Sequence, residues 1–103
     1  MSASVTENPE LNRYEIREDD QLAGFLSYSE SGGTRDFSHT EVDQAFSGRG
    51  LASKLVRGAL DDARAKSVEV VPSCSVVKHF VGKNPEYLDV LSSKSREQLE
   101  AGA

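Results

Sequence analysis

The 103-residue sequence contains only one cysteine, no tryptophan and no long run of apolar residues. The single cysteine, Cys74, cannot form a disulfide within the chain, and one thiol does not build a cysteine-based metal site. The longest apolar runs are only a few residues, which is too short for a membrane-spanning helix. The N-terminal MSASVTENPE lacks the basic and then apolar segments of a secretory signal. We therefore expect a cytoplasmic protein with no metal site, in which Cys74 is either core filler or a reactive group.

The chain also lacks an excess of positive charge. It has 12 Lys and Arg against 17 Asp and Glu, a formal net charge of -5. Nucleic acids and anionic membranes are held by clustered Lys and Arg, so neither is expected as a partner. Any anion must be bound by a local site. The length fits a single small domain.

The two ends of the chain show no apolar period. Residues 1–11 are rich in Ser, Thr, Glu, Asn and Pro, which predicts a disordered tail, and residues 92–103 are expected to form a second, frayed tail. Between them, residues 12–17 and 22–28 alternate apolar and polar side chains around a turn at 18–20, which predicts two antiparallel strands. Residues 34–42, TRDFSHTEV, favour a third strand or two strands joined at a bend. We expect one domain over residues 12–91 that begins with an antiparallel meander.

The apolar period changes from two to 3.6 after Gly50, which predicts a long helix from Leu51 to about Lys66. Residues 68–71 are rich in β-branched valine and stop at a proline, so a right-handed crossover and a parallel strand pair are expected. A short helix over 76–81 is predicted to end at Gly82. Asn84 and Pro85 have the pattern of an N-cap and a first helical residue, opening a last turn or two. The order is that of an α+β fold with one internal βαβ unit.

Two glycines stand at the junction of the meander and the long helix, in QAFSGRGLASKL. Glycine inside an element costs roughly 0.5–1 kcal/mol relative to alanine, so the pair indicates a backbone requirement. Free amide groups and the positive end of the helix dipole meet at such a junction, which favours phosphate binding. Arg49 and Lys54 could add local positive charge. A dinucleotide fingerprint G-x-G-x-x-G is the alternative, but Ser53 occupies its third glycine.

Four ordered motifs resemble one family. Ser47-Gly48-Arg49-Gly50-Leu51-Ala52 is similar to the acetyl-CoA motif of the GNAT acetyltransferases, [QR]-x-x-G-x-[GA]. The flanking His39-Thr40-Glu41-Val42 and Leu51-Ala52-Ser53-Lys54-Leu55-Val56 resemble those of a small single-domain branch. Val70-Val71-Pro72-Ser73-Cys74 and Asn84-Pro85-Glu86-Tyr87 resemble its later motifs. The resemblance spans roughly residues 12–91.

This resemblance implies a truncated GNAT-like fold that binds acetyl-CoA. The pantetheine would run along the strand that carries Glu41 and Val42, and the pyrophosphate would rest on the residues Phe46, Ser47, Gly48, Arg49, Gly50, Leu51 and Ala52. The chain departs from the pattern at Ala45, where the motif has Gln or Arg, and at Asn84, where the branch has His. It also ends before the last strands of a full-length family member.

Acetyl transfer to an amine needs a base, a polarised carbonyl and a proton for the departing thiolate. Glu41 or His39 are the candidate bases, Tyr87 the candidate acid and Cys74 a candidate nucleophile at a helix start. The alternatives are a surface histidine, a core tyrosine and an inert buried cysteine. We expect an N-acetyltransferase-like protein acting on a small-molecule or protein amine. A non-catalytic coenzyme A binding module, or a dinucleotide-binding domain, is the alternative function.

Overall fold

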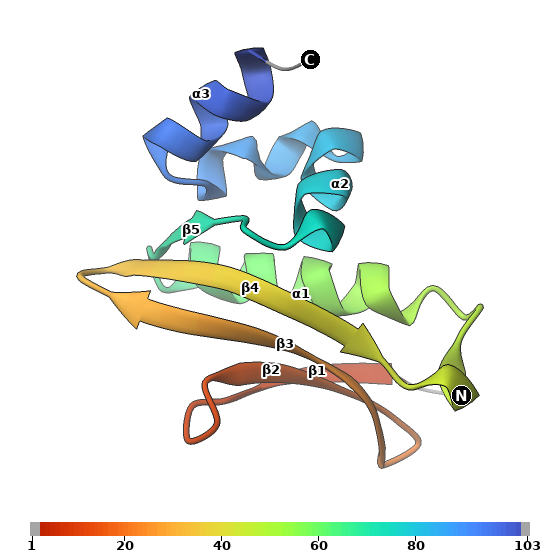
Figure 1. The fold of residues 1–103 in the computed structure, drawn as a ribbon. Helices are drawn as coiled ribbons and strands as arrows, with labels where there is room; N and C mark the ends of the chain where they lie inside the picture. The colour runs from red at the N-terminus through yellow and green to blue at the C-terminus, as the bar shows by residue number, and fades with distance from the viewer. Residues whose placement is uncertain (1–2, 102–103) are drawn as a thin grey trace.

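The structure is a computed structural model that describes residues 3–101 (Figure 1). Its five strands form one mixed sheet in the order β1-β2-β3-β4-β5. Three α-helices and two short 3-10 helices complete the α+β fold, so the fold class expected from the sequence is confirmed. The elements are β1 (Ala3–Asn8), β2 (Arg13–Glu18), β3 (Gln21–Ser31), β4 (Thr34–Val42), η1 (Gln44–Phe46), α1 (Leu51–Ala65), β5 (Glu69–Val71), α2 (Ser75–Lys83), η2 (Pro85–Val90) and α3 (Ser93–Ala101).

Strands β2, β3 and β4 form the predicted antiparallel meander. The apolar residues of the alternating pattern face one side, where Tyr14, Ile16, Leu26 and Phe37 are at most 1% exposed. The run over residues 34–42 is one strand, with a register shift opposite Ser27 and Tyr28 of β3. Of the two possibilities left open by the sequence, the structure therefore has one continuous strand and not two strands joined at a bend.

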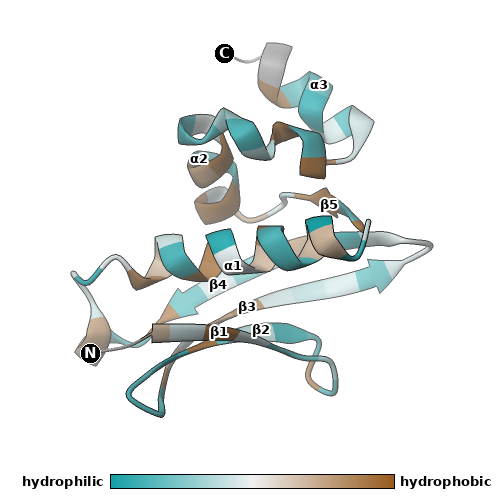
Figure 2. Cartoon of the chain, turned by 180° about the vertical axis from the view of Figure 1, so that it is seen from behind, coloured by the Kyte–Doolittle hydropathy of each residue, from teal (hydrophilic) through white to brown (hydrophobic). Residues whose placement is uncertain are grey.

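Helix α1 covers the apolar face of the sheet, as Figure 1 and the reverse view in Figure 2 show. Six of its residues are buried, and they recur at helical spacing: Leu51, Leu55, Val56, Ala59, Leu60 and Ala63. After α1 the chain returns along the sheet, and β5 pairs in parallel with β4 from Thr34 to Asp36. The predicted βαβ unit is therefore confirmed. Helices α2 and α3 lie beyond the β5 edge (Figure 1).

The expectation of unpacked tails was wrong within the described residues. Ala3–Asn8 form β1, which pairs antiparallel with β2 over six residues. Val5 packs against the core beside Gly58 of α1, where a built Cβ would lie 2.8 Å from Val5 Cβ. Ala3 also packs against the core, but the next inward position is the polar Glu7, so the apolar alternation of this edge strand is too short to recognise in the sequence. Residues 1 and 2 of the predicted tail lie outside the described part.

At the other end of the chain, residues 93–101 form α3 instead of a frayed tail. The chain is attached to the sheet just before this helix, because Ser92 N donates a hydrogen bond to Val70 O at 2.9 Å. Leu99 also packs against the core. Residues 102 and 103 lie outside the described part.

Helix α2 was predicted to end at Gly82 but continues to Lys83. Asn84 does not cap the next turn with its side chain, as the sequence suggested. Its Nδ2 donates instead to Phe80 O at 2.8 Å, closing the end of α2. Pro85 does occupy the first position of η2, as predicted. Among residues 3–101, no helix is long and apolar enough to cross a membrane.

Candidate functional site

The glycine turn leads directly into the first turn of α1. Gly48 and Gly50 have φ values of 79° and 71°, in the left-handed region that favours glycine. Gly50 is the N-cap residue and has no side chain with which to cap the helix. The first amide groups of α1 therefore depend on solvent or a ligand for hydrogen bonds. A Cβ built on either glycine meets no atom within 4 Å, so the space in front of the turn is open.

A cavity of about 230 Å³ opens over this turn. Seven of its eight lining residues are coenzyme-binding residues expected from the sequence. The lining consists of Val42, Phe46, Ser47, Gly48, Gly50, Leu51, Ala52 and Ser53. The arrangement combines open space, backbone amides and the positive end of a helix dipole, which suits an anionic group.

Arg49 is the expected coenzyme residue that does not line this cavity. Its guanidinium forms an ion pair and hydrogen bond with the Glu18 carboxylate at the end of β2. The same guanidinium lies over the Phe46 ring, 5.5 Å from the centroid. Sequence reasoning placed Arg49 in the loop correctly but did not reveal its partner, because Glu18 is 31 residues earlier.

Cys74 lies where β4 and β5 diverge. The two strands pair only as far as Asp36, and Cys74 N then donates to Phe37 O at 2.9 Å. The thiol points at β4, with Sγ 3.5 Å from Thr40 Oγ1, and the residue is 8% exposed. Burial raises the pKa of Cys74. Hydrogen bonds with the Thr40 hydroxyl and with the backbone amides at the start of α2 lower this pKa, and together they outweigh the effect of burial. The net pKa is below the usual value, as expected for a thiol at a helix N-terminus.

His39 and Glu41 contact each other, as the sequence predicted, with Nε2 and Oε1 3.3 Å apart. Thr40 between them pairs with the buried Leu26 and so faces the α1 layer. His39 and Glu41 therefore face the opposite side of β4. Their side chains are 59% and 62% exposed, and the His39 ring lies 6.0 Å from that of Phe25. The candidate bases and Cys74 thus lie on two sides of the same strand.

Tyr87 contacts α1 at a point well beyond the glycine turn. Its hydroxyl donates to Asp61 Oδ1 at 2.9 Å and accepts from Arg57 Nη1 at 3.2 Å, and its ring packs 5.6 Å from that of Phe80. Asp61 is ten residues after Leu51 in α1, which is about 15 Å along the helix axis. Burial and the Asp61 carboxylate raise the pKa of Tyr87. This environment favours the alternative of a packed aromatic over that of a catalytic acid.

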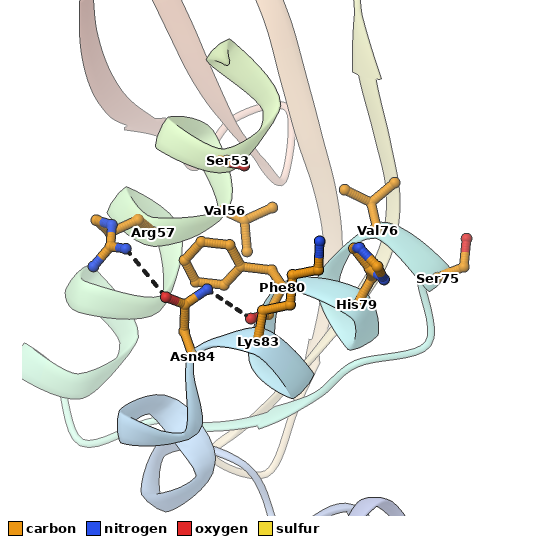
Figure 3. Close-up of a pocket in the computed structure, with 9 residues that line it drawn as sticks. All are labelled: Ser53, Val56, Arg57, Ser75, Val76, His79, Phe80, Lys83 and Asn84. Carbon is orange, nitrogen blue, oxygen red and sulfur yellow. Dashed lines mark hydrogen bonds between the residues drawn. The ribbon is translucent and has the colours of Figure 1, made fainter. Parts of the chain in front are cut away.

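A larger groove of about 660 Å³ lies between α1 and α2, and sequence reasoning missed it (Figure 3). Ser53 lines both this groove and the cavity over the glycine turn. The groove contains three basic side chains among its lining residues, which are Ser53, Val56, Arg57, Ser75, Val76, His79, Phe80, Lys83 and Asn84. Asn84 Oδ1 lies 3.5 Å from Arg57 Nη2 (Figure 3). The i,i+4 spacing of His79 and Lys83 in the sequence places both side chains on one face of α2. The third basic residue of the groove, Arg57, lies on α1, so the sequence alone did not bring the three together.

Comparison with known proteins agrees with this geometry. The model of the GCN5-related N-acetyltransferase family matches residues 13–90. Protein NATD1 of Xenopus tropicalis is 37% identical over 60 residues, covering 56% of this chain and 55% of that protein. Protein NATD1 of Bos taurus is 38% identical over 58 residues, covering 54% and 51%. The match thus spans about half the length of these relatives.

The fold is also similar to a solved structure. An NMR solution structure of a GCN5-like protein from Staphylococcus aureus superposes with a TM-score of 0.65. It is 23% identical in sequence, and the superposition covers 86% of this chain and 87% of that one. At this identity the likeness concerns the fold alone.

Proposed function

Because this chain belongs to the GCN5-related N-acetyltransferase family, we propose that it binds acetyl-CoA and transfers the acetyl group to an amine. The observation that carries this proposal is the cavity over the glycine turn at the start of α1. The acceptor, a small-molecule or protein amine, stays a prediction from the sequence. A cytoplasmic location stays a prediction as well.

The coenzyme pyrophosphate would bind in the cavity over the turn, since Gly48 and Gly50 add no side chain to it and the first residues of α1 line it. The groove between α1 and α2 shares the lining residue Ser53 with this cavity. Its Lys83 and Arg57 would interact there with the phosphorylated nucleotide end. The pantetheine would extend the other way, past Val42 of β4 toward the divergence of β4 and β5.

The residues near that divergence suit acetyl transfer. Acetyl-CoA supplies the activated acetyl group. His39, supported by the Glu41 carboxylate 3.3 Å away, would take the proton of an amine arriving on the open face of the sheet. The amine nitrogen would then form the new C–N bond as the C–S bond breaks, and the coenzyme leaves as the thiol after taking up a proton. In an alternative route, the Cys74 sulfur would form a bond to the acetyl carbon as the bond to the coenzyme sulfur breaks, and the thiol proton would pass to the departing sulfur. The amine nitrogen would then form the C–N bond as the bond to Cys74 breaks, and an amine proton would restore the Cys74 thiol.

Binding is tested by thermal and chemical unfolding with acetyl-CoA, coenzyme A, NAD and ATP. We expect stabilisation by acetyl-CoA and coenzyme A, of about 2.7 kcal/mol at a hundredfold excess over Kd. Stabilisation by NAD alone would support the dinucleotide alternative instead.

The loop is tested with Gly48→Val, which we expect to weaken coenzyme binding because a branched side chain would enter the cavity. Gly33→Val is the matched control, because Gly33 has φ 82° and equally open surroundings but lies in the β3–β4 turn. The two variants should lose similar stability from backbone strain, while only Gly48→Val loses affinity. Equal affinity in both variants would count against the loop.

Catalysis is tested by mass spectrometry after incubation with acetyl-CoA and a panel of amines. We expect either an acetylated amine or acetyl-Cys74, and a Cys74→Ser variant distinguishes the two routes. A protein that binds coenzyme A but consumes no thioester across the panel would be the non-catalytic binding module.

A further inference from the structure

We propose that Glu18 is a positioning residue for the glycine turn, which it holds in its binding-competent shape through Arg49. Glu18 ends β2, and its side chain is only 8% exposed. Arg49 lies between the two glycines and is 43% exposed, and its Nη1 donates to Glu18 Oε2. The pair joins the centre of the turn to the end of β2, a strand that is paired on both sides within the sheet. This inference rests on the proposed function of the turn as the coenzyme site.

The Glu18 side of the contact is itself well supported. Residues Asp19 and Asp20 have φ values of 50° and 69°, so β2 and β3 are joined by a two-residue turn with both central residues in the left-handed region. Such turns match the twist of the paired strands and set their register. Glu18 pairs with Gln21 in β3 and with Ala3 in β1. Its carboxylate is therefore presented from a fixed position inside the sheet.

The glycine turn itself has few contacts that would hold its backbone in place. Gly48 and Gly50 have no side chains and no atoms within 4 Å of a built Cβ, and glycine loses the most conformational freedom on ordering. The guanidinium of Arg49 also lies over the Phe46 ring, which packs against the core. One side chain thus links the start of the turn, its centre and the sheet. Holding the turn in advance reduces the entropy lost when a ligand binds.

The direction of the Arg49 side chain separates this role from that of a phosphate ligand. Arg49 is absent from the lining of the cavity over the turn, whereas its neighbours on both sides line it. Its charge is compensated by the Glu18 carboxylate, which does not line that cavity either. In this arrangement the anion contacts backbone amides from the front, and Arg49 holds the backbone from behind.

The test compares Glu18→Gln, Arg49→Met and the double variant, with Glu10→Gln as the control for an equal change of charge on the exposed β1–β2 turn. If either single variant reduces the competent fraction of the turn to about a tenth, the Kd for coenzyme A rises about tenfold. We expect that loss in both single variants, no further loss in the double variant, and a higher KM for acetyl-CoA with an unchanged kcat. The salt dependence of binding should not change in Arg49→Met, since no phosphate contact is lost.

Tighter coenzyme binding by Glu18→Gln together with weaker binding by Arg49→Met would overturn the proposal, because Arg49 would then be a phosphate ligand that Glu18 competes for. Additive losses in the double variant would overturn it too. Hydrogen exchange of the amides of residues 46–52 without coenzyme provides an independent readout, which should be faster in both single variants. If the wild-type protein bound no coenzyme A, the proposed function would fail, and unchanged exchange in Arg49→Met would separately refute the positioning role.

Discussion

Glu7 joins β1 to the rest of the fold, and replacing it by glutamine tests that contact. Its carboxylate accepts hydrogen bonds from the Tyr28 hydroxyl and from Lys66 Nζ, and lies 3.2 Å from Arg35 Nη1. The Glu7 side chain is only 12% exposed. Burial raises the pKa of Glu7, but the hydrogen bonds from Lys66 and Tyr28 and the charge of Arg35 together lower it from 4.5 to about 2.

This pKa gives the magnitude and the sign of the effect. The fall from 4.5 to about 2, at 1.36 kcal/mol for each pH unit, corresponds to about 3 kcal/mol of stability at neutral pH. Because the pKa is lower in the folded state, this stability is present above pH 4.5 and is lost as the pH falls through about 2. Glu7→Gln should therefore be less stable than wild type by about 3 kcal/mol at pH 7. The two proteins should converge in acid.

The assay is urea unfolding followed by circular dichroism at several pH values between 2 and 7. Glu10→Gln is the control, since this exposed residue in the β1–β2 turn makes the same charge change. Its loss of stability should be within about 0.5 kcal/mol. A difference between wild type and Glu7→Gln that stays constant with pH, or an equal loss in Glu10→Gln, would refute the reasoning.

Three further changes test other contacts. Gly58→Ala should lower the free energy of unfolding by about 1 kcal/mol, because the new Cβ would lie 2.8 Å from Val5 and displace β1. Alanine favours a helix more than glycine does, so a more stable variant would contradict this packing. Cys74 should react with an alkylating agent at a lower pH than a free thiol, and Thr40→Val should move its profile to higher pH; identical profiles would remove the assigned cause of the lowered pKa. Tyr87→Phe should lose about 1 kcal/mol of stability in urea unfolding and keep its kcat, whereas a large fall in kcat would support the catalytic acid.

The meander, the glycine turn, α1 and β5 were predictable because each depends on a local pattern. Alternation in β2 and β3, helical spacing from Leu51 to Ala63 and β-branched residues before Pro72 each act over a few neighbouring residues. The candidate coenzyme residues were predictable for the same reason, since all of them except Val42 are consecutive in the chain. The cavity that seven of them line is built by one turn, the helix that it begins and the end of β4.

The strand β1 was missed because only Ala3 and Val5 in it are apolar, while polar contacts made by Glu7 provide much of its attachment to the fold. Glu7 finds Tyr28, Arg35 and Lys66 at separations of 21 to 59 residues. A segment rich in asparagine, threonine and glutamate resembles a disordered tail in composition. It forms a strand here because its side chains find partners that are distant in the sequence.

The sequence by itself determined the order of elements, the backbone freedom at Gly48 and Gly50, and the residues that α1 buries, because local sterics and hydrophobic periodicity govern these features. Tertiary structure alone decided that Arg49 faces Glu18 and that α1 and α2 enclose a basic groove. These features require side chains distant in sequence to meet across the sheet and between helices. Contacts of this kind depend on how the whole chain packs, and no short segment of the sequence determines that packing.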